Sequence, residues 1–234
     1  MTVKSLWLSS LVVFIALTVC RTSASEQNPI KIVTLGDSIT YGVRKGVPVD
    51  AIFASRIDKS LNAQGISCSV VNVGIGGERT DQALKRLDRD VLSLQPQVVV
   101  VMYGTNDSYV DVGKKQSRIS ADAYEKNLRE IVSRLRASKV QPILMTEPRW
   151  GDDAGKNGLG EHPNVRLERY VERCRQVAKE LKVPLIDNFS TWTEAHDGGL
   201  DLSQWTTDEC HPNSRGHQVI ADSLLAVLRK QLSR

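Results

Sequence analysis

The chain has 234 residues, of which 41% are hydrophobic and 25% are charged, a composition typical of a globular protein rather than a disordered one. Its 31 basic and 27 acidic residues give a formal charge of +4, a surplus too small to indicate a polyanion such as nucleic acid as a partner. The length allows one substantial hydrophobic core and hardly two domains.

The N-terminal segment has the pattern of a secretory signal peptide. Lys4 precedes an apolar run over residues 6–19, and small residues follow at 23–25. We expect residues 1–25 to be removed and residues 26–234 to form one secreted or periplasmic domain without a stable membrane span, since the run is short for one. A retained membrane anchor is an alternative. Lipid attachment at Cys20 is another, although Val19 is larger than the residue usually found before such a cysteine.

Five short, β-branched and almost continuously apolar segments follow, at residues 30–37, 68–74, 97–104, 141–147 and 183–188. Strands that are covered on both faces have this composition. Between them, residues 124–135 and 167–181 carry apolar side chains at helical spacing, and a last helix is predicted after Ser214. This alternation predicts a parallel sheet with helices on both faces, in which ligands bind beyond the carboxyl ends of the strands.

The ends of the first three predicted strands carry the residues of greatest chemical interest. The first ends in Gly36-Asp37-Ser38, the second runs into glycines up to Gly77, and the third is followed by Asn106. A serine nucleophile needs hydrogen-bond donors for the developing oxyanion, and the N–H groups of Ser38 and Gly77 and the amide of Asn106 are candidates. Taken singly, an ordinary tight turn explains each glycine and a loop-capping side chain explains Asn106.

A serine nucleophile also needs a base and a carboxylate that orients the base. Asp208 and His211 lie three residues apart just before the last predicted helix, and Pro212 fixes the backbone after the histidine. In a tight turn this spacing lets the carboxylate hold one imidazole nitrogen while the other faces outward. No carboxylate lies at a comparable spacing beside the other three histidines, for which we expect surface or packing roles: His162, His196 and His217.

Other chemistries find less support in the sequence. The stretch 71–79 has Arg79 where a dinucleotide fingerprint needs its third glycine, and residues 151–157 do not have the spacing of a phosphate loop. The histidines form no HExxH pair, and the three cysteines after the signal peptide have no metal-ligand spacing. We therefore expect no metal and no cofactor. One disulfide remains an open possibility among Cys68, Cys174 and Cys210.

Four stretches, GDSIT, GIGGER, GTND and DECHP, resemble in order and context the four sequence blocks of the GDSL esterases, also called SGNH hydrolases. The resemblance extends from Lys31 to the last helix. It implies a three-layer α/β/α sandwich with a central five-stranded parallel sheet, similar to flavodoxin. Two departures from the family pattern are Ile39, where the family name has leucine, and Glu209, where many members have glycine.

The resemblance also implies the roles of individual residues. Ser38 would attack an acyl carbonyl, His211 would be the base, and Asp208 would orient it. The N–H groups of Ser38 and Gly77 and the side chain of Asn106 would hold the oxyanion, with Gly77 rather than Gly76 as the glycine of the second block.

Two long connections, at about residues 147–164 and 188–213, are candidate substrate loops. They contain Trp150, Trp192 and Trp205, and aromatic faces stack on sugar rings, although buried aromatics also anchor loops. We expect an exported esterase that removes short acyl groups, most of all acetyl, from carbohydrate. Alternatives are a lysophospholipase or thioesterase acting on longer acyl chains, acyl transfer, and carbohydrate binding without hydrolysis.

Overall fold

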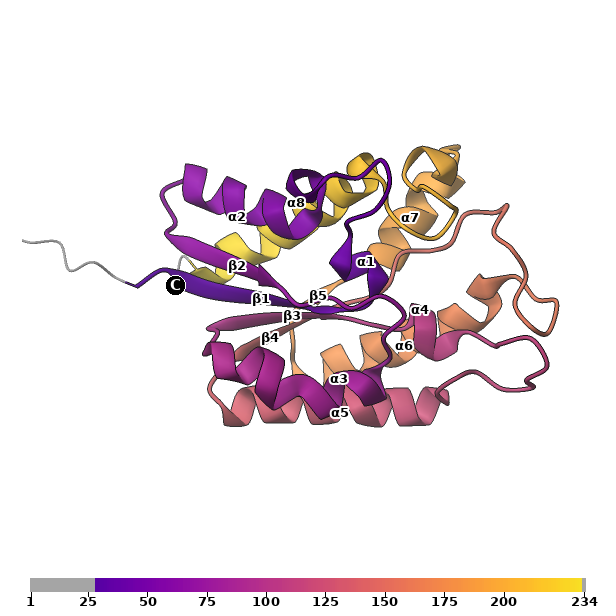
Figure 1. Cartoon of the computed structure of the whole chain (residues 1–234), viewed down its shortest axis with the longest axis horizontal. Coiled ribbons are helices and arrows are strands. Elements are labelled where there is room, and N and C mark those ends of the chain that lie inside the picture. Colours follow the sequence, from indigo (N-terminus) through magenta and orange to yellow (C-terminus); the bar gives the residue numbers. More distant parts are fainter. Residues whose placement is uncertain (1–27, 233–234) are drawn as a thin grey trace, which may run out of the picture.

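The computed structural model describes residues 28–232 and contains a five-stranded sheet in the order β2-β1-β3-β4-β5 (Figure 1). All neighbouring strands are parallel. This sheet confirms the predicted fold class. The strands are β1 (Ile30–Gly36), β2 (Cys68–Asn72), β3 (Val98–Met102), β4 (Gln141–Met145) and β5 (Leu185–Ile186).

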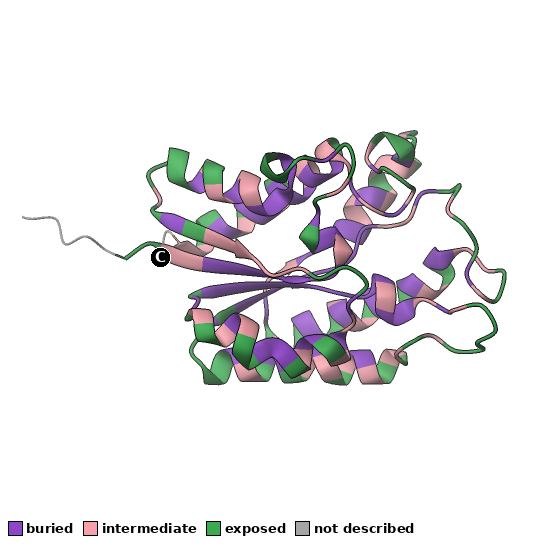
Figure 2. Ribbon diagram, in the orientation of Figure 1, coloured by how far each residue is buried: buried purple, intermediate pink, exposed green. Residues whose placement is uncertain are grey.

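Helices cover both faces of the sheet, so the molecule has three layers. One face packs against α2 (Phe53–Ala63), α7 (Asn188–Asp197) and α8 (Ser214–Leu232), and the other against α3 (Thr80–Arg86), α5 (Ala121–Ala137) and α6 (Pro163–Leu181) (Figure 1). Successive residues of β3 alternate between the two cores: Val98 and Val100 face the first, and Val99 and Val101 face the second. Every residue of β3 is therefore buried, and the central strands are drawn almost entirely in the colour of buried residues (Figure 2).

Short helical turns connect these elements. They are α1 (Ser38–Tyr41), η1 (Val49–Ala51), η2 (Leu87–Val91), η3 (Leu92–Leu94), α4 (Thr105–Ser108) and η4 (Leu202–Gln204). Two of them follow strands at the carboxyl edge of the sheet, since α1 follows β1 and α4 follows β3. The ends of these central strands are the positions where the sequence places Ser38 and Asn106.

The predicted connection 188–213 is not simply a loop, because it contains α7 and η4. Asp187 caps α7 by accepting a hydrogen bond from the N–H of Ser190 (3.1 Å), and the helix buries Phe189 and Trp192. The helix cap at Asp187 ends the last strand, which we expected over residues 183–188 and which spans only Leu185–Ile186.

The predicted signal peptide and Cys20 lie outside the described residues. Within residues 28–232, no helix combines the length and the apolarity that crossing a bilayer requires.

Candidate active site

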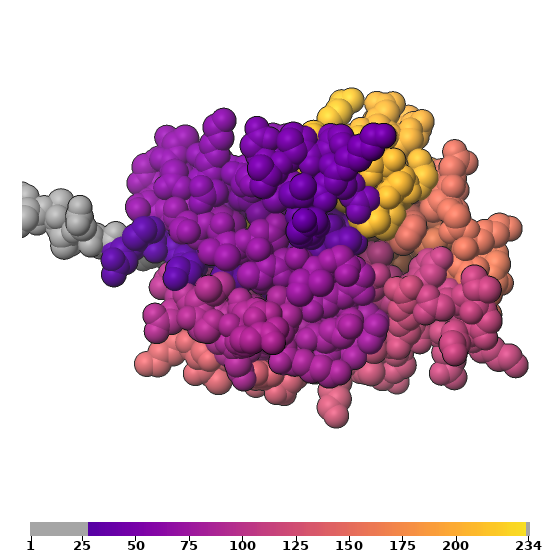
Figure 3. All heavy atoms as spheres, in the orientation of Figure 1, coloured from indigo at the N-terminus to yellow at the C-terminus, as the bar shows by residue number. Residues whose placement is uncertain are grey.

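The structure brings Ser38, His211 and Asp208 together at the carboxyl edge of the sheet. The Oγ atom of Ser38 lies 2.9 Å from Nε2 of His211, across 173 residues of sequence. Nδ1 of His211 lies 2.8 Å and 3.0 Å from the two carboxylate oxygens of Asp208. The segment after β1 thus lies against the C-terminal part of the chain, where the indigo and yellow atoms approach each other in Figure 3. This arrangement can pass a proton from the hydroxyl to the imidazole.

Ser38 is held by its local backbone. Asp37 is the N-cap of α1 and its carboxylate accepts a hydrogen bond from the N–H of Ile39 (2.9 Å). Because Ser38 is the first residue of that helix, its N–H is one of those that have no partner inside the helix. The strand and the cap together fix a half-buried serine whose hydroxyl faces the imidazole.

The turn that carries Asp208 and His211 is closed by its own hydrogen bonds. The Asp208 carboxylate accepts bonds from the backbone N–H groups of His211 (2.8 Å) and Cys210 (3.3 Å). Glu209 has a φ of +65°, in the left-handed region that favours glycine. Its side chain packs over Gly151, where an added Cβ would meet a Glu209 oxygen at 1.8 Å. The turn therefore keeps its shape without the glycine common in the family, and Gly151 leaves the room for Glu209.

The electrostatics of the pair favour a neutral imidazole beside an ionised carboxylate. Burial raises the pKa of the Asp208 carboxyl, but the hydrogen bonds from His211 and Cys210 outweigh it and hold that pKa below its usual range. Burial and the positive charge of Arg44 lower the pKa of His211, against the opposing effect of Asp208. Arg44 Nη1 lies 2.8 Å from Oδ2 of Asp208, so the aspartate is shared between an arginine and the histidine. The sequence analysis did not identify Arg44, which belongs to no motif.

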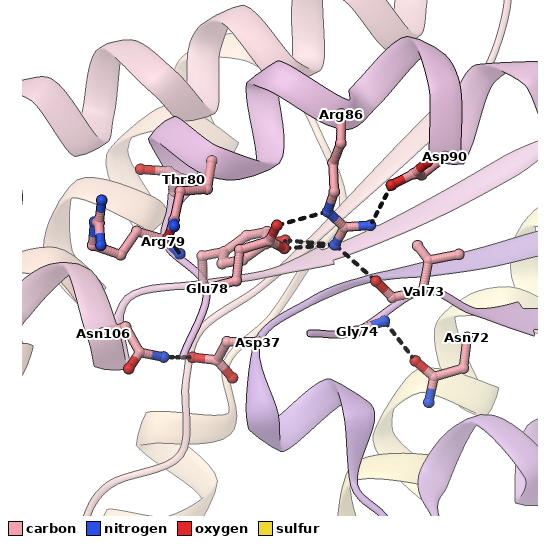
Figure 4. A network of polar contacts seen from close by, with 12 residues as sticks. Asp37, Asn72, Val73, Gly74, Glu78, Arg79, Thr80, Arg86, Asp90 and Asn106 are labelled. Atoms are coloured by element: carbon pink, nitrogen blue, oxygen red, sulfur yellow. Dashed lines mark hydrogen bonds and ion pairs between the residues drawn. The ribbon is translucent and has the colours of Figure 1, made fainter. Parts of the chain in front are cut away.

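Gly77 and Asn106 lie on the loops that follow β2 and β3. Gly77 has a φ of +75°, which a residue with a side chain adopts only with strain, and within residues 28–232 its N–H has no hydrogen-bond acceptor. Asn106 donates from Nδ2 to Oδ2 of Asp37 (2.8 Å) (Figure 4), and its Oδ1 accepts from Nη1 of Arg118 (3.2 Å). These two contacts fix which way the amide points.

A buried ion pair supports the loop that carries Gly77. Arg86 donates from Nε to Oε1 of Glu78 (2.6 Å) and from Nη2 to Oε2 of Glu78 (2.5 Å) and to the carbonyl of Val73 (2.7 Å) (Figure 4). The hydroxyl of Tyr103 donates to the same carboxylate at 2.5 Å. Both charged side chains are less than a tenth exposed. The network ties the loop after β2 to α3 and β3, and no sequence motif pointed to it.

Three buried acids lie behind the site. Burial raises the pKa of Asp37 to about 7 and that of Asp107 to about 6. Burial and the neighbouring Asp37 raise the pKa of Glu147 well above its usual range, and both its oxygens lack a hydrogen-bond partner among the described residues. Burial without a hydrogen-bond partner therefore favours the protonated form of Glu147. Asp107 instead accepts bonds from the N–H (3.1 Å) and hydroxyl (2.5 Å) of Thr80 at the start of α3.

The prediction that Trp192 binds substrate is wrong. Its side chain is fully buried in the core beneath α7, where it packs edge-on against Trp205 with ring centroids 4.9 Å apart. The alternation of polar and apolar residues in 188–213 did not reveal that this segment is a helix with an inward face. Trp150 is half-buried and stacks on Tyr109 (6.3 Å), and Trp205 is also half-buried. A contact of these two with substrate stays a prediction.

None of the remaining histidine and cysteine side chains forms a hydrogen bond with Ser38 among the described residues. His162 caps α6, His217 is buried, and His196 lies 2.7 Å from an oxygen of Asp152. Cys68, Cys174 and Cys210 are all free and buried, so none of the disulfides that the sequence left open forms. Within residues 28–232, His, Cys, Asp and Glu side chains do not gather in threes as a metal site would need.

Two cavities among the described residues lie at different distances from the candidate active site. One cavity, of about 570 Å³, is lined by residues such as Ile30, Gln97 and Gln141 at the opposite, amino edge of the sheet and touches none of the site residues. A second, of about 550 Å³, adjoins Asn106 through Arg118. We regard the second as the relevant one, since ligands of parallel α/β sheets bind at the carboxyl edge.

Comparison with known proteins agrees with this geometry. The sequence profile of the GDSL-like Lipase/Acylhydrolase family matches residues 34–219. The "Uncharacterized lipoprotein YqeF" of Bacillus subtilis is 29% identical over 72% of this chain and 74% of its own length. The "Thioesterase 1/protease 1/lysophospholipase L1" of Escherichia coli is 27% identical over 89% of this chain and 86% of its own. A crystal structure of an acetyl xylan esterase, AlAXEase, superimposes with a TM-score of 0.71 at 25% identity, over 85% of this chain and 99% of that one.

Proposed function

Because the chain belongs to the GDSL-like lipase/acylhydrolase family and is thus a carboxylic ester hydrolase, we propose that it is an exported serine esterase of short acyl esters. Its substrates are O-acetyl groups on carbohydrate. The observation that carries the proposal is the hydrogen-bonded series from Ser38 Oγ through the His211 imidazole to the Asp208 carboxylate.

In the proposed reaction, Ser38 Oγ adds to the ester carbonyl carbon while Nε2 of His211 takes the hydroxyl proton. Asp208 stabilises the imidazolium that forms. The N–H groups of Ser38 and Gly77 and the amide of Asn106 donate to the oxyanion. The C–O bond to the alcohol then breaks, the alcohol leaves with the proton from His211, and an acyl group remains on Ser38. Water, deprotonated by His211, releases the acid and restores the serine.

Two observations support a short acyl group on carbohydrate. The cavity beside Asn106 is lined by polar and charged side chains, which suit a hydroxylated substrate better than an alkyl chain. The printed name of one similar structure is that of an acetyl xylan esterase. Trp150 and Trp205, half-buried in the connections that flank the site, are the aromatic surfaces proposed to stack on sugar.

The second candidate function is hydrolysis of esters with longer acyl chains. Exposed apolar side chains near Ser38 favour it. Tyr41, Val43 and Ile75 are each more than a third exposed. Tyr41 and Ile75 lie close together, because the loop after β2 packs against α1 so tightly that a Cβ on Gly74 would meet the backbone N of Tyr41 at 2.3 Å. The Escherichia coli relative carries the names of a thioesterase and a lysophospholipase.

Export is proposed from the N-terminal sequence and from the lipoprotein name of the Bacillus relative. Mass spectrometry of the protein from its host distinguishes the routes. A chain that starts near residue 26 supports signal cleavage, and a diacylated Cys20 at the N-terminus supports lipid anchoring. An unprocessed Met1 in the soluble fraction would contradict export.

The experiment that tests the function measures acetate released from acetylated xylan, alongside aryl esters with acyl chains of two to twelve carbons. We expect Ser38-dependent release that falls steeply as the acyl chain lengthens, with Ser38→Ala as the control. A rise with chain length would move the assignment to the second candidate. Turnover that survives Ser38→Ala would remove the serine from the role proposed here.

A further inference from the structure

The cavity beside Asn106 is strongly basic. Four of its seven lining side chains are cationic: Arg79, Lys114, Lys115 and Arg118. Asp111 is the only acid among them, and it is occupied by Arg118, whose guanidinium approaches it to 2.6 Å and also lies over the Tyr109 ring (5.0 Å). Among residues 28–232 neither lysine has an ion-pair partner. Arg79 is itself paired with Asp81 (3.1 Å), so the two lysines supply the positive charge of the cavity that no carboxylate of residues 28–232 neutralises.

Backbone hydrogen bonds hold the basic segment in place around the cavity. The N–H of Lys114 donates to the carbonyl of Asp111 (3.0 Å), and the N–H of Arg118 donates to the carbonyl of Tyr109 (2.9 Å). The N–H of Gly158 bonds the carbonyl of Val110 (2.8 Å), which ties this segment to the connection before α6. The two lysines therefore extend from a closed turn rather than from a free strand of chain.

The cavity adjoins both loops of the proposed oxyanion site. Arg118 donates to Oδ1 of Asn106 (3.2 Å), and Arg79 follows Gly77 by two residues. Figure 4 shows Arg79 and Asn106 on the same side of the loop that follows β2. A substrate whose carbonyl oxygen lies between Gly77 and Asn106 therefore has this cavity next to it. A volume of about 550 Å³ accommodates a group of the size of one sugar ring.

We propose that this cavity binds an anionic group, a carboxylate or a phosphate, on the alcohol portion of the ester substrate. The inference rests on the proposed esterase function. The lining offers no apolar wall for an acyl chain, whereas unpaired ammonium groups beside guanidinium groups attract and orient anions. An anionic ester is thus selected over a neutral ester of the same shape, through both its rate of encounter and its orientation.

The test uses two substrate pairs that differ only in the charged group. One pair is O-acetyl galacturonic acid and O-acetyl galactose, and the other is acetyl glycerol phosphate and acetyl glycerol. We expect kcat/KM for the anionic member of at least one pair to exceed that for the neutral member by about tenfold. The pair that shows the effect distinguishes carboxylate from phosphate. Equal values in both pairs would overturn the proposal.

The double variant Lys114→Gln/Lys115→Gln assigns the effect to the cavity. We expect it to lower the anionic-to-neutral ratio about threefold to tenfold, as for exposed charge pairs, with a weaker salt dependence of that ratio. The matched control, Lys59→Gln/Lys179→Gln, removes the same charge from exposed positions on α2 and α6 and leaves the ratio unchanged. An equal loss in both double variants would show a general charge effect and overturn the site.

A binding measurement separates this proposal from the esterase function. Calorimetric titration of the Ser38→Ala protein with trigalacturonate, glycerol phosphate and neutral xylotriose needs no turnover. Lysine-dependent binding of an anion without turnover of any ester would retain the site and reject the proposed hydrolysis. If aryl acetate is turned over in a Ser38-dependent way but neither anion binds more tightly than xylotriose, the proposed esterase function stands and the proposed anion site is wrong.

Discussion

Arg44 lies next to the proposed catalytic pair, Asp208 and His211, and we expect it to affect the pH dependence of activity. It shares Asp208 with His211, and its charge is the second cause, after burial, of the lowered pKa of the imidazole. Activity through a neutral His211 is lost as pH falls through that pKa, so we expect the acid limb of kcat/KM to lie below pH 6.5. Arg44→Gln removes the positive charge and moves this limb to higher pH. The measurement is the pH profile of both proteins with an aryl acetate, and superimposable acid limbs would contradict the account.

Asn106 is the residue whose proposed role depends most on orientation. If its amide donates to the oxyanion, Asn106→Ala lowers kcat about a hundredfold or more with little change in KM, because the interaction forms only in the transition state. Thermal unfolding of the variant shows whether the buried Asp37, which loses a donor, perturbs the fold. A kcat near that of the wild type would show that Asn106 only donates to Asp37 and does not stabilise the oxyanion.

The sequence could indicate Ser38, Asp208 and His211 as candidate site residues because each lies in a short motif that can be recognised without the structure. Asp208 and His211 lie in one turn, and Ser38 follows a recognisable strand. Arg44 and Glu147 could not be predicted in the same way. Arg44 meets Asp208 across 164 residues, and Glu147 is an ordinary carboxylate in the sequence whose burial depends on the packing of three layers.

At the level of the elements, the loop between β2 and α3 depends on the Glu78–Arg86 pair. Removing one partner of a buried pair leaves the other charge without compensation, and we expect Glu78→Ala to lower the free energy of unfolding by about 3–5 kcal/mol. Urea denaturation measures this change. The double variant Glu78→Leu/Arg86→Met removes both charges and should recover a large part of the loss. A loss in the double variant equal to that in Glu78→Ala would show that the uncompensated charge is not its cause.

Helix α7 is expected to behave as part of the core rather than as a substrate loop. Trp192→Ala removes a fully buried indole and should cost about 3–5 kcal/mol of unfolding free energy. Where the variant is still folded, its KM for a sugar acetate should match that of the wild type. Denaturation and steady-state kinetics at low temperature check both expectations. A raised KM with unchanged stability would restore Trp192 to the substrate site.

The sequence predicted the five strands and the long helices α5, α6 and α8 because each has an uninterrupted periodic pattern. It did not identify α2, α3 and α7 as helices. α3 has only seven residues, and α7 mixes polar residues with a few inward aromatics, so their patterns are weak. Their positions are decided by packing against the sheet and by caps such as Asp187, which are tertiary effects.

At the scale of the whole molecule, the buried acids affect how stability varies with pH. Glu147 keeps its proton in the folded protein at a pH where the unfolded chain has lost it, because its pKa is raised on folding. The folded state then binds more protons than the unfolded state, so this group lowers the free energy of unfolding as pH rises above about 4.5. Glu147→Gln removes this contribution. We expect its unfolding free energy to fall less steeply than that of the wild type between pH 5 and pH 8 in urea titrations, whereas parallel curves would contradict a protonated Glu147.

The distance in sequence between Ser38 and His211 affects how the enzyme matures. Ser38 leaves the ribosome 173 residues before His211, its proposed base, and β1, to which Ser38 is attached, pairs with β3 as well as with β2. A nascent chain therefore lacks the contact between Ser38 and His211 through most of its synthesis. In the proposed mechanism, hydrolytic activity needs the last turn to reach Ser38 at the carboxyl edge of the sheet. The first appearance of turnover during refolding is therefore expected to report the formation of this contact across 173 residues of sequence.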